Sequence, residues 1–314
     1  MRKKQIRQFI IAFIFTLLLY AIFMFMITSG VINSYWTGIM IVACINIILT
    51  TSLNLASGYL GQLTLGHAGF MAVGAYTSAL LSLKLGLHFV IGGLAGALLA
   101  AVVGLIIGIP TLRLKGDYLC IITLAFNEII RIILLNLDIT RGAKGLRGIP
   151  RTTSFSIAFL FVVITVFVIY SIVKSRHGRA IVSIREDETA SELAGIPVSY
   201  YKILAFVISA FFAGIAGSLY AHYMGMLVPA TFDYNKSVEI LVMVVLGGLG
   251  NIKGSIIAAI VLTFLPEVLR SFSDLRMLTY AIVLIAAMVI KETNIVPQLK
   301  AKFMKNNAVE EVAE

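Results

Sequence analysis

Three polar residues, Asn127, Glu128 and Arg131, lie inside an apolar run that extends from about residue 119 to residue 137. Charged side chains at membrane depth are costly, and they usually face the interior of a helix bundle or a water-filled cavity. Glu128 and Arg131 are three residues apart on the expected helix, so they can neutralise one another. The pattern therefore predicts either a structural ion pair or the polar lining of a transport pathway.

Further polar residues lie in a glycine-rich stretch between residues 54 and 69. A lone histidine in such a stretch, here His67, is more often a hydrogen-bonded structural residue than a ligand, and Asn54 has the same interpretation. The alternative is that these side chains line a substrate pathway. The candidate pathway residues are Asn54, Gln62, His67, Asn127, Glu128 and Arg131.

Enzymatic motifs are missing from the sequence. Gly248, Gly250 and Gly254 have GxGxxxG spacing without a surrounding βαβ pattern, which argues against a dinucleotide loop. The lysine at position 253 is not preceded by glycine, so the chain has no phosphate loop of its own, and neither GxSxG nor HExxH occurs. Two isolated cysteines support neither a disulfide framework nor a zinc site. We therefore expect no catalytic site, cofactor or metal in this chain.

A polar segment, residues 174–202, carries five Lys or Arg and four acidic residues. Three consecutive acids favour a helix N-terminus, a small apolar stripe follows, and Gly195 and Pro197 are suited to ending the helix. The pattern predicts a short amphipathic helix over residues 186–195 that can dock into a groove on a soluble partner, although a plain surface helix would look similar. The candidate docking residues are Glu186, Glu188, Leu193, Ala194 and Gly195.

The composition determines which environment surrounds these residues. Of 314 residues, 60% are hydrophobic and 13% are charged, and the mean hydropathy is +0.99. A water-soluble fold of this size cannot bury so much apolar surface, so lipid must surround most of the chain. The net charge of +10 is then expected in cytoplasmic loops rather than on a nucleic-acid interface.

Apolar stretches predict about ten membrane crossings in a single all-α transmembrane domain over residues 1–314. The first is an uncleaved helix over residues 9–27 that follows a basic start. The other stretches are 36–56, 67–83, 89–110, 118–137, 155–173, 203–226, 238–250, 255–269 and 277–290. Small-xxx-small spacings such as Gly92/Gly96, Gly104/Gly108 and Ala210/Gly214/Ser218 predict close helix packing.

The basic start predicts a cytoplasmic N-terminus in a bacterial cell membrane. Parity then places residues 113–117, the coupling loop 174–202 and the basic tail 291–314 in the cytoplasm. The loop at residues 138–154 is expected outside, although it carries four basic residues and one acid.

Two crossings, which contain residues 54–69 and 238–250, are too short for simple spans. The first is too rich in glycine for a regular helix, and the second ends in a run of glycines. Irregular backbone at membrane depth needs cover from protein or a cavity, and paired broken segments in transporters mark the translocation site. Ordinary surface loops are the alternative.

Several segments together resemble the LivM-type permeases of branched-chain amino acid ABC importers over residues 36–290. Residues 188–195 (ETASELAG) resemble the loop through which such permeases engage their ATPases, although the second residue is Thr rather than Ala. The wider match rests on residues 52–70 (SLNLASGYLGQLTLGHAGF), 113–118 (RLKGDY), 178–180 (GRA), 185–187 (RED), 205–214 (AFVISAFFAG) and 245–250 (VLGGLG).

The resemblance implies a multi-pass subunit that pairs with a LivH-like second permease. Two cytoplasmic LivG/LivF-like ATPases would bind the helix at residues 186–195, and an external binding protein would deliver leucine, isoleucine or valine. Related permeases for urea, other amides or other amino acids share much of the pattern, so the substrate stays open. An ion-coupled secondary transporter that uses Glu128 and His67 is the alternative from another class.

Overall fold

A computed structural model describes residues 16, 18–111, 116–269, 281 and 285. The chain divides into two compact units, residues 1–260 and 261–314, so the single-domain interpretation stays a prediction. The basic start, most of the 113–117 loop, nearly all of the 277–290 crossing and the 291–314 tail lie outside the described residues.

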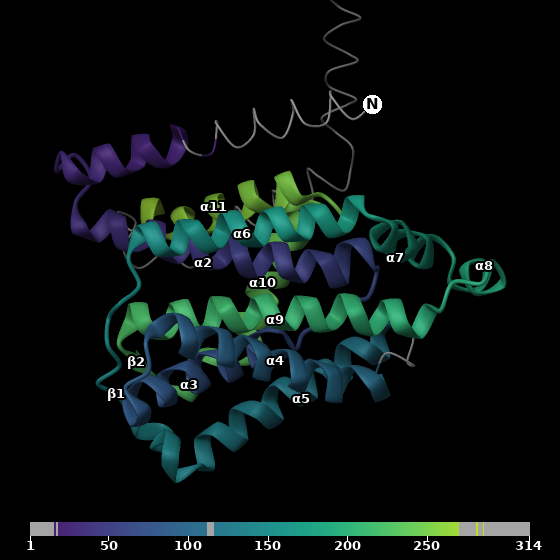
Figure 1. Ribbon diagram of the computed structural model, residues 1–314, viewed down its shortest axis with the longest axis horizontal. Helices are drawn as coiled ribbons and strands as arrows, with labels where there is room; N and C mark the ends of the chain where they lie inside the picture. Colours follow the sequence, from purple (N-terminus) through teal and green to yellow (C-terminus); the bar gives the residue numbers. More distant parts are fainter. Residues whose placement is uncertain (1–15, 17, 112–115, 270–280, 282–284, 286–314) are drawn as a thin grey trace, which may run out of the picture. The chain divides into compact units, whose positions relative to one another are not determined.

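The described part is almost entirely helical (Figure 1). An apolar helix occupies Leu18–Thr28. The longer elements are α2 (Ser34–Asn54), α3 (His67–Leu85), α4 (Phe89–Thr111), α5 (Asp117–Asn136), α6 (Phe155–Lys174), α7 (Arg176–Glu186), α8 (Glu188–Leu193), α9 (Val198–Met224), α10 (Tyr234–Gly247) and α11 (Ile252–Val268). A π-helix at Leu55–Tyr59 continues α2, and short 3-10 turns lie at Asp138–Thr140, Gly142–Lys144 and Pro229–Phe232 (η4).

Six of these helical segments are long and apolar enough to cross a membrane: Ser34–Tyr59, His67–Leu85, Phe89–Thr111, Tyr118–Asn136, Phe155–Lys174 and Val198–Met224. They coincide with predicted crossings, which confirms a polytopic helical membrane protein. The predicted total of about ten is not confirmed, because α10 and α11 are shorter and part of the chain is not described. At 27 residues, α9 extends about 40 Å and exceeds the apolar thickness of a bilayer.

Small residues bring α3, α4 and α9 into backbone contact, as the predicted spacings require. A Cβ on Gly96 of α4 would lie 2.6 Å from the carbonyl oxygen of Gly74 on α3. A Cβ on Gly214 of α9 would lie 2.8 Å from the Cα atom of Ala97 on α4. Such positions accept only glycine, since side chains would separate the helices.

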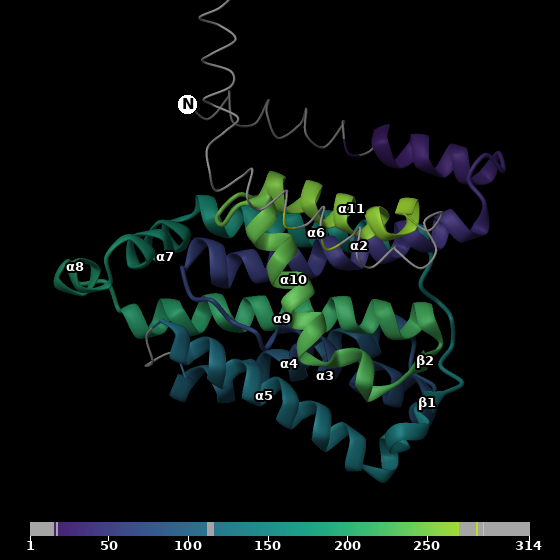
Figure 2. The same cartoon turned by 180° about the vertical axis from the view of Figure 1, so that it is seen from behind.

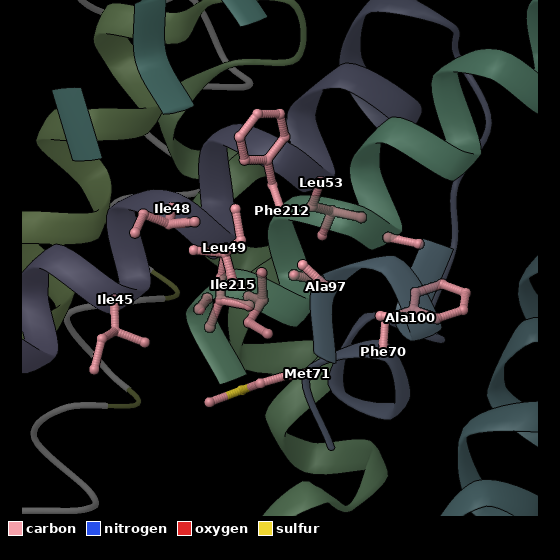
Figure 3. Close-up of a cluster of buried hydrophobic side chains, with 14 of the residues drawn as sticks. Ile45, Ile48, Leu49, Leu53, Phe70, Met71, Ala97, Ala100, Phe212 and Ile215 are labelled. Atoms are coloured by element: carbon pink, nitrogen blue, oxygen red, sulfur yellow. The ribbon is translucent and has the colours of Figure 1, made fainter. Parts of the chain in front are cut away.

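Larger apolar side chains fill the space where α2 meets this group of helices. Figure 3 shows this cluster, in which side chains from α2, α3, α4 and α9 converge. Its labelled members are Ile45, Ile48, Leu49, Leu53, Phe70, Met71, Ala97, Ala100, Phe212 and Ile215.

Two connections lie at opposite ends of the first unit (Figures 1 and 2). Helices α7 and α8 lie at one end. At the other end, strand β1 (Leu146–Arg147) pairs antiparallel with β2 (Met226–Leu227), which joins the basic 138–154 loop to the segment that follows α9. The helix α6 separates the two connections, and the side of the membrane on which each of them lies stays a prediction.

Candidate functional site

The first glycine-rich segment interrupts the helix pattern, as predicted. After the π-helix, an irregular linker at residues 60–66 leads to α3. Its polar backbone is satisfied by neighbouring helices: the Leu65 N–H donates to Thr123 Oγ1 at 3.1 Å, and the Ala68 N–H donates to Ser237 Oγ at 3.0 Å. The end of the irregular segment, at residues 64–66, is therefore packed against protein, as irregular backbone inside a membrane bundle requires, whereas Gly61 and Leu63 are exposed.

The second glycine-rich segment separates α10 from α11 and contacts the first. Gly248 and Gly250 have positive φ angles of 98° and 78°, which glycine adopts without strain. The fully buried Asn54 connects the segments, because its Oδ1 accepts the Gly250 N–H at 2.9 Å and its Nδ2 donates to Ser255 Oγ at 2.8 Å. Gly58 packs directly against the Gly250 nitrogen. We call Gly58, Gly61 and Gly250 the glycine junction.

The other two candidate residues of the first segment lie away from these contacts. His67 is buried at the start of α3, where its Nε2 lies 2.8 Å from Ser52 Oγ. Gln62 is half-buried in the linker. Asn54 and His67 thus both make hydrogen bonds within the chain, and a role of these residues in a substrate pathway stays a prediction.

Helix α5 carries the remaining candidates, and it contains the predicted ion pair. Arg131 Nε lies 2.7 Å from Glu128 Oε2, and both side chains are about one-quarter exposed, at 29% and 23%. The buried Asn127 donates through Nδ2 to the carbonyl oxygen of Phe232 at 3.4 Å, so it joins α5 to η4. Asn127 also packs against Gly69, two residues after His67, so α5 contacts the start of α3.

The outward faces of α4 and α5 differ in polarity. Exposed large side chains on α4 are all aliphatic: Val90, Ile91, Leu94, Leu98, Leu99, Val102, Leu105, Ile106 and Ile109. The outward face of α5 combines exposed isoleucines, such as Ile129 and Ile132, with the partly exposed Glu128–Arg131 pair. Of these two faces, only the face of α4 has the apolar composition expected of a helix that faces lipid.

The predicted start of the helix over residues 186–195 is wrong. Glu186 is the last residue of α7, and Asp187 has extended backbone angles of φ −155° and ψ 111° that separate α7 from α8. The Asp187 carboxylate accepts the Ala190 N–H at 3.0 Å. An aspartate in this position caps a new helix, which therefore begins at Glu188.

The end of α8 is as predicted. Gly195 has a φ of +82°, its N–H donates to the Glu192 carbonyl at 2.9 Å, and the Ile196 N–H donates to the Ser191 carbonyl at 3.1 Å. This is a Schellman ending, in which glycine supplies the left-handed residue. Ala194 is the C-cap residue. Leu193, at the last position of α8, is 86% exposed.

Sequence reasoning missed a buried lysine that holds α8. Lys202, in the second turn of α9, is 4% exposed, and its Nζ lies 2.8 Å from Glu188 Oε2. A lysine near the start of an apolar helix is usually an interfacial anchor, so its type and position gave no signal of this pairing. Together with the Asp187 cap, the ion pair fixes α8 against α9.

Within the residues that the structure describes, no group of three or more His, Cys, Asp or Glu side chains could hold a metal ion. Two surface features of the described residues remain as candidate functional sites. One is the short helix α8, which presents an exposed leucine, and the other is the α5 face with its ion pair.

Comparisons with known proteins agree with this architecture. Residues 35–290 match the family described as branched-chain amino acid transport system / permease component. The Escherichia coli protein named "High-affinity branched-chain amino acid transport system permease protein LivM" is 36% identical, with 90% of this chain and 74% of that protein covered. A Methanocaldococcus jannaschii protein named "Probable branched-chain amino acid transport permease protein LivM" is 27% identical, with 66% and 73% covered. The chain therefore belongs to the branched-chain amino acid transport system permease family.

Proposed function

We propose that this chain is one of two permease subunits of an ATP-driven importer in the bacterial cell membrane. The relatives named as branched-chain amino acid permeases support leucine, isoleucine or valine as the substrate. ATP hydrolysis would occur in two separate cytoplasmic subunits, and an external binding protein would deliver the amino acid. The chain itself would carry out no chemistry.

The exposure of Leu193 at the tip of α8 carries the proposal. A leucine that is 86% exposed on a polar connection gains nothing in water, whereas it fits an apolar groove on a soluble partner. The Asp187 cap, the Gly195 ending and the Glu188–Lys202 pair keep α8 rigid, so docking does not require ordering it first. We assign this groove to the ATPase, so the α7–α8 end would be cytoplasmic, and by the parity of the predicted crossings both termini would be cytoplasmic too.

The α5 face supports contact with the second permease subunit. A Glu–Arg pair that is about one-quarter exposed cannot face lipid without a large penalty, so this face needs protein or water against it. The substrate pathway would then run along α5, between the two permeases. In this arrangement Glu128 is neutralised by Arg131, which disfavours its use as an ion-coupling group in a secondary transporter.

Transport would proceed by alternating access. Closure of the ATPases would displace α8, and the displacement would favour one of two states of the permease pair. Such a bias requires contacts that differ between the two states, because a partner that binds both states equally shifts nothing.

The proposal is tested by tagging this chain, co-expressing it with the ATPase and permease genes that accompany it, and purifying the complex. Leu193→Glu should abolish retention of the ATPases and leucine uptake. The matched control is Leu85→Glu. Leu85 is also a highly exposed leucine (65%), but it is the last residue of α3. The nearby Leu83 approaches Gly148 beside β1, so this end of α3 lies far from α8. Retention of the ATPases by folded Leu193→Glu would refute the docking role. Uptake of urea rather than leucine would contradict the proposed substrate class.

A further inference from the structure

Arg185, in the last turn of α7, contacts both glycine-broken segments. Its Nη1 donates to the carbonyl oxygen of Gly58 at 2.8 Å. The same nitrogen lies 2.9 Å from the point where a Cβ on Gly250 would be, and Cγ lies 3.0 Å from the corresponding point on Gly61. One side chain from α7 therefore contacts all three residues of the glycine junction.

The contact depends on the absence of side chains at the junction. Gly61 and Gly250 have φ angles of 79° and 78°, which other residues rarely adopt. A Cβ at Gly250 would lie 2.9 Å from Nη1, so the guanidinium would have to shift away from its present position. The glycines thus allow the backbone turns and the close approach of Arg185 at the same time.

Arg185 is also close to the docking helix along the chain. It lies two residues before Asp187, the N-cap of α8, with only Glu186 between them. A displacement of α8 would therefore reach Arg185 through the extended Asp187 and the helical Glu186. Arg185 would pass it to the Gly58 carbonyl through a charge-assisted hydrogen bond, which is stronger than a neutral one. The Glu188–Lys202 pair forms a separate connection from α8 to α9.

We propose that Arg185 is a positioning residue that transmits the movement of α8 to the glycine junction. The proposal rests on the proposed docking of an ATPase at α8. It predicts that loss of Arg185 separates ATP hydrolysis from transport while the ATPases stay bound. A residue that only completes the docking surface would instead lose the ATPases.

The test uses the complete importer, reconstituted in proteoliposomes with its binding protein. Three quantities are measured for each variant: the amount of ATPase retained, the rate of ATP hydrolysis and the leucine uptake per ATP hydrolysed. Arg185→Ala should retain the ATPases and hydrolysis but lower uptake per ATP by about tenfold or more, the scale of one hydrogen bond to a charged group. Arg185→Lys keeps the positive charge and one donor nitrogen, so its uptake per ATP should fall less. Arg179→Ala is the control, because Arg179 and Arg185 are both exposed arginines of α7, and the contacts with Gly58, Gly61 and Gly250 come from Arg185.

A second measurement is independent of the partner subunits. Hydrogen–deuterium exchange of the purified chain in detergent should become faster at residues 56–62 and 248–252 in Arg185→Ala, and should not change there in Arg179→Ala. Unchanged exchange in Arg185→Ala, unchanged uptake per ATP, or loss of the ATPases would each overturn the proposal. If the unsubstituted chain retained no ATPase, the proposed function would be wrong. The exchange data would still show whether Arg185 stabilises the backbone of the glycine junction.

Discussion

The Lys202–Glu188 ion pair allows a quantitative test of how α8 is held. Glu188→Gln removes the charge that faces a lysine side chain only 5% exposed, while Lys202→Met removes the buried charge itself. Breaking a fully buried pair costs about 3–5 kcal/mol when one charge is left without its partner. Because the Glu188 side chain is 33% exposed, water screens part of the interaction, and we expect Glu188→Gln to cost about 2 kcal/mol.

Removing the buried charge should be less harmful than stranding it. In Lys202→Met the apolar stem keeps its packing and the partly exposed carboxylate regains water, so the expected cost is about 1 kcal/mol or less. The double variant should match Lys202→Met, so the coupling energy between the two sites should equal the cost of Glu188→Gln, about 2 kcal/mol. The control pair is Lys236–Glu239 within α10, at 3.0 Å with a glutamate 41% exposed. Glu239→Gln should cost about 0.5 kcal/mol or less.

The measurement is the free energy of unfolding of the purified chain in detergent, obtained by titration with SDS and followed by circular dichroism at a helical wavelength. If Lys202→Met proved as destabilising as Glu188→Gln, the packing of the lysine stem would govern stability and the stranded-charge argument would be wrong.

Four further predictions concern other contacts. Asn54→Ala should destabilise the chain by about 2–3 kcal/mol in the same titration, since it strands the Gly250 N–H, whereas Ser255→Ala should cost about 1 kcal/mol. Gly217→Ala should cost about 1–3 kcal/mol because a Cβ there would collide with the Met71 carbonyl; an unchanged unfolding midpoint would contradict the backbone contact. Glu128→Gln should lower the folded yield more than it changes uptake selectivity, and altered selectivity at normal yield would contradict a structural ion pair. Gly195→Pro should abolish leucine uptake because it removes the N–H that ends α8 and forbids φ +82°; uptake that persisted in folded protein would count against docking by α8.

Helix positions and close packing could be predicted because they depend on local properties of the sequence. The predicted crossing at residues 155–173 is α6, Phe155–Lys174. The spacings that include Gly96, Gly104 and Gly214 do place α4 against α3 and α9. Apolar length and the period of small residues determine both outcomes, so no tertiary information was needed.

Contacts between distant residues were not predictable in this way. Asn54 and Gly250 are 196 residues apart, and nothing in the type of either residue selects the other. The break at Asp187 was misjudged because an acid at the N-cap and acids in the first turn give similar sequence patterns. Lys202 pairs across a connection, so the helical spacing of charges does not reveal it.

The glycine contacts among α3, α4 and α9 have a mechanical consequence. Where backbone lies on backbone, as at Gly74 and Gly96, no rotamer change is possible, so the helices cannot slide past one another in small steps. The three helices should therefore move as one rigid body. Helix α5 approaches the backbone of this body near the start of α3, at Gly66 and Gly69. A displacement of Lys202 would then be transmitted along α9 to His222, about 30 Å away. The Nδ1 of His222 lies 2.9 Å from the Pro150 carbonyl oxygen, in the connection at the other end of the unit. Helix α9 would in this way connect α8 mechanically to the β1–β2 connection at the other end of the first unit.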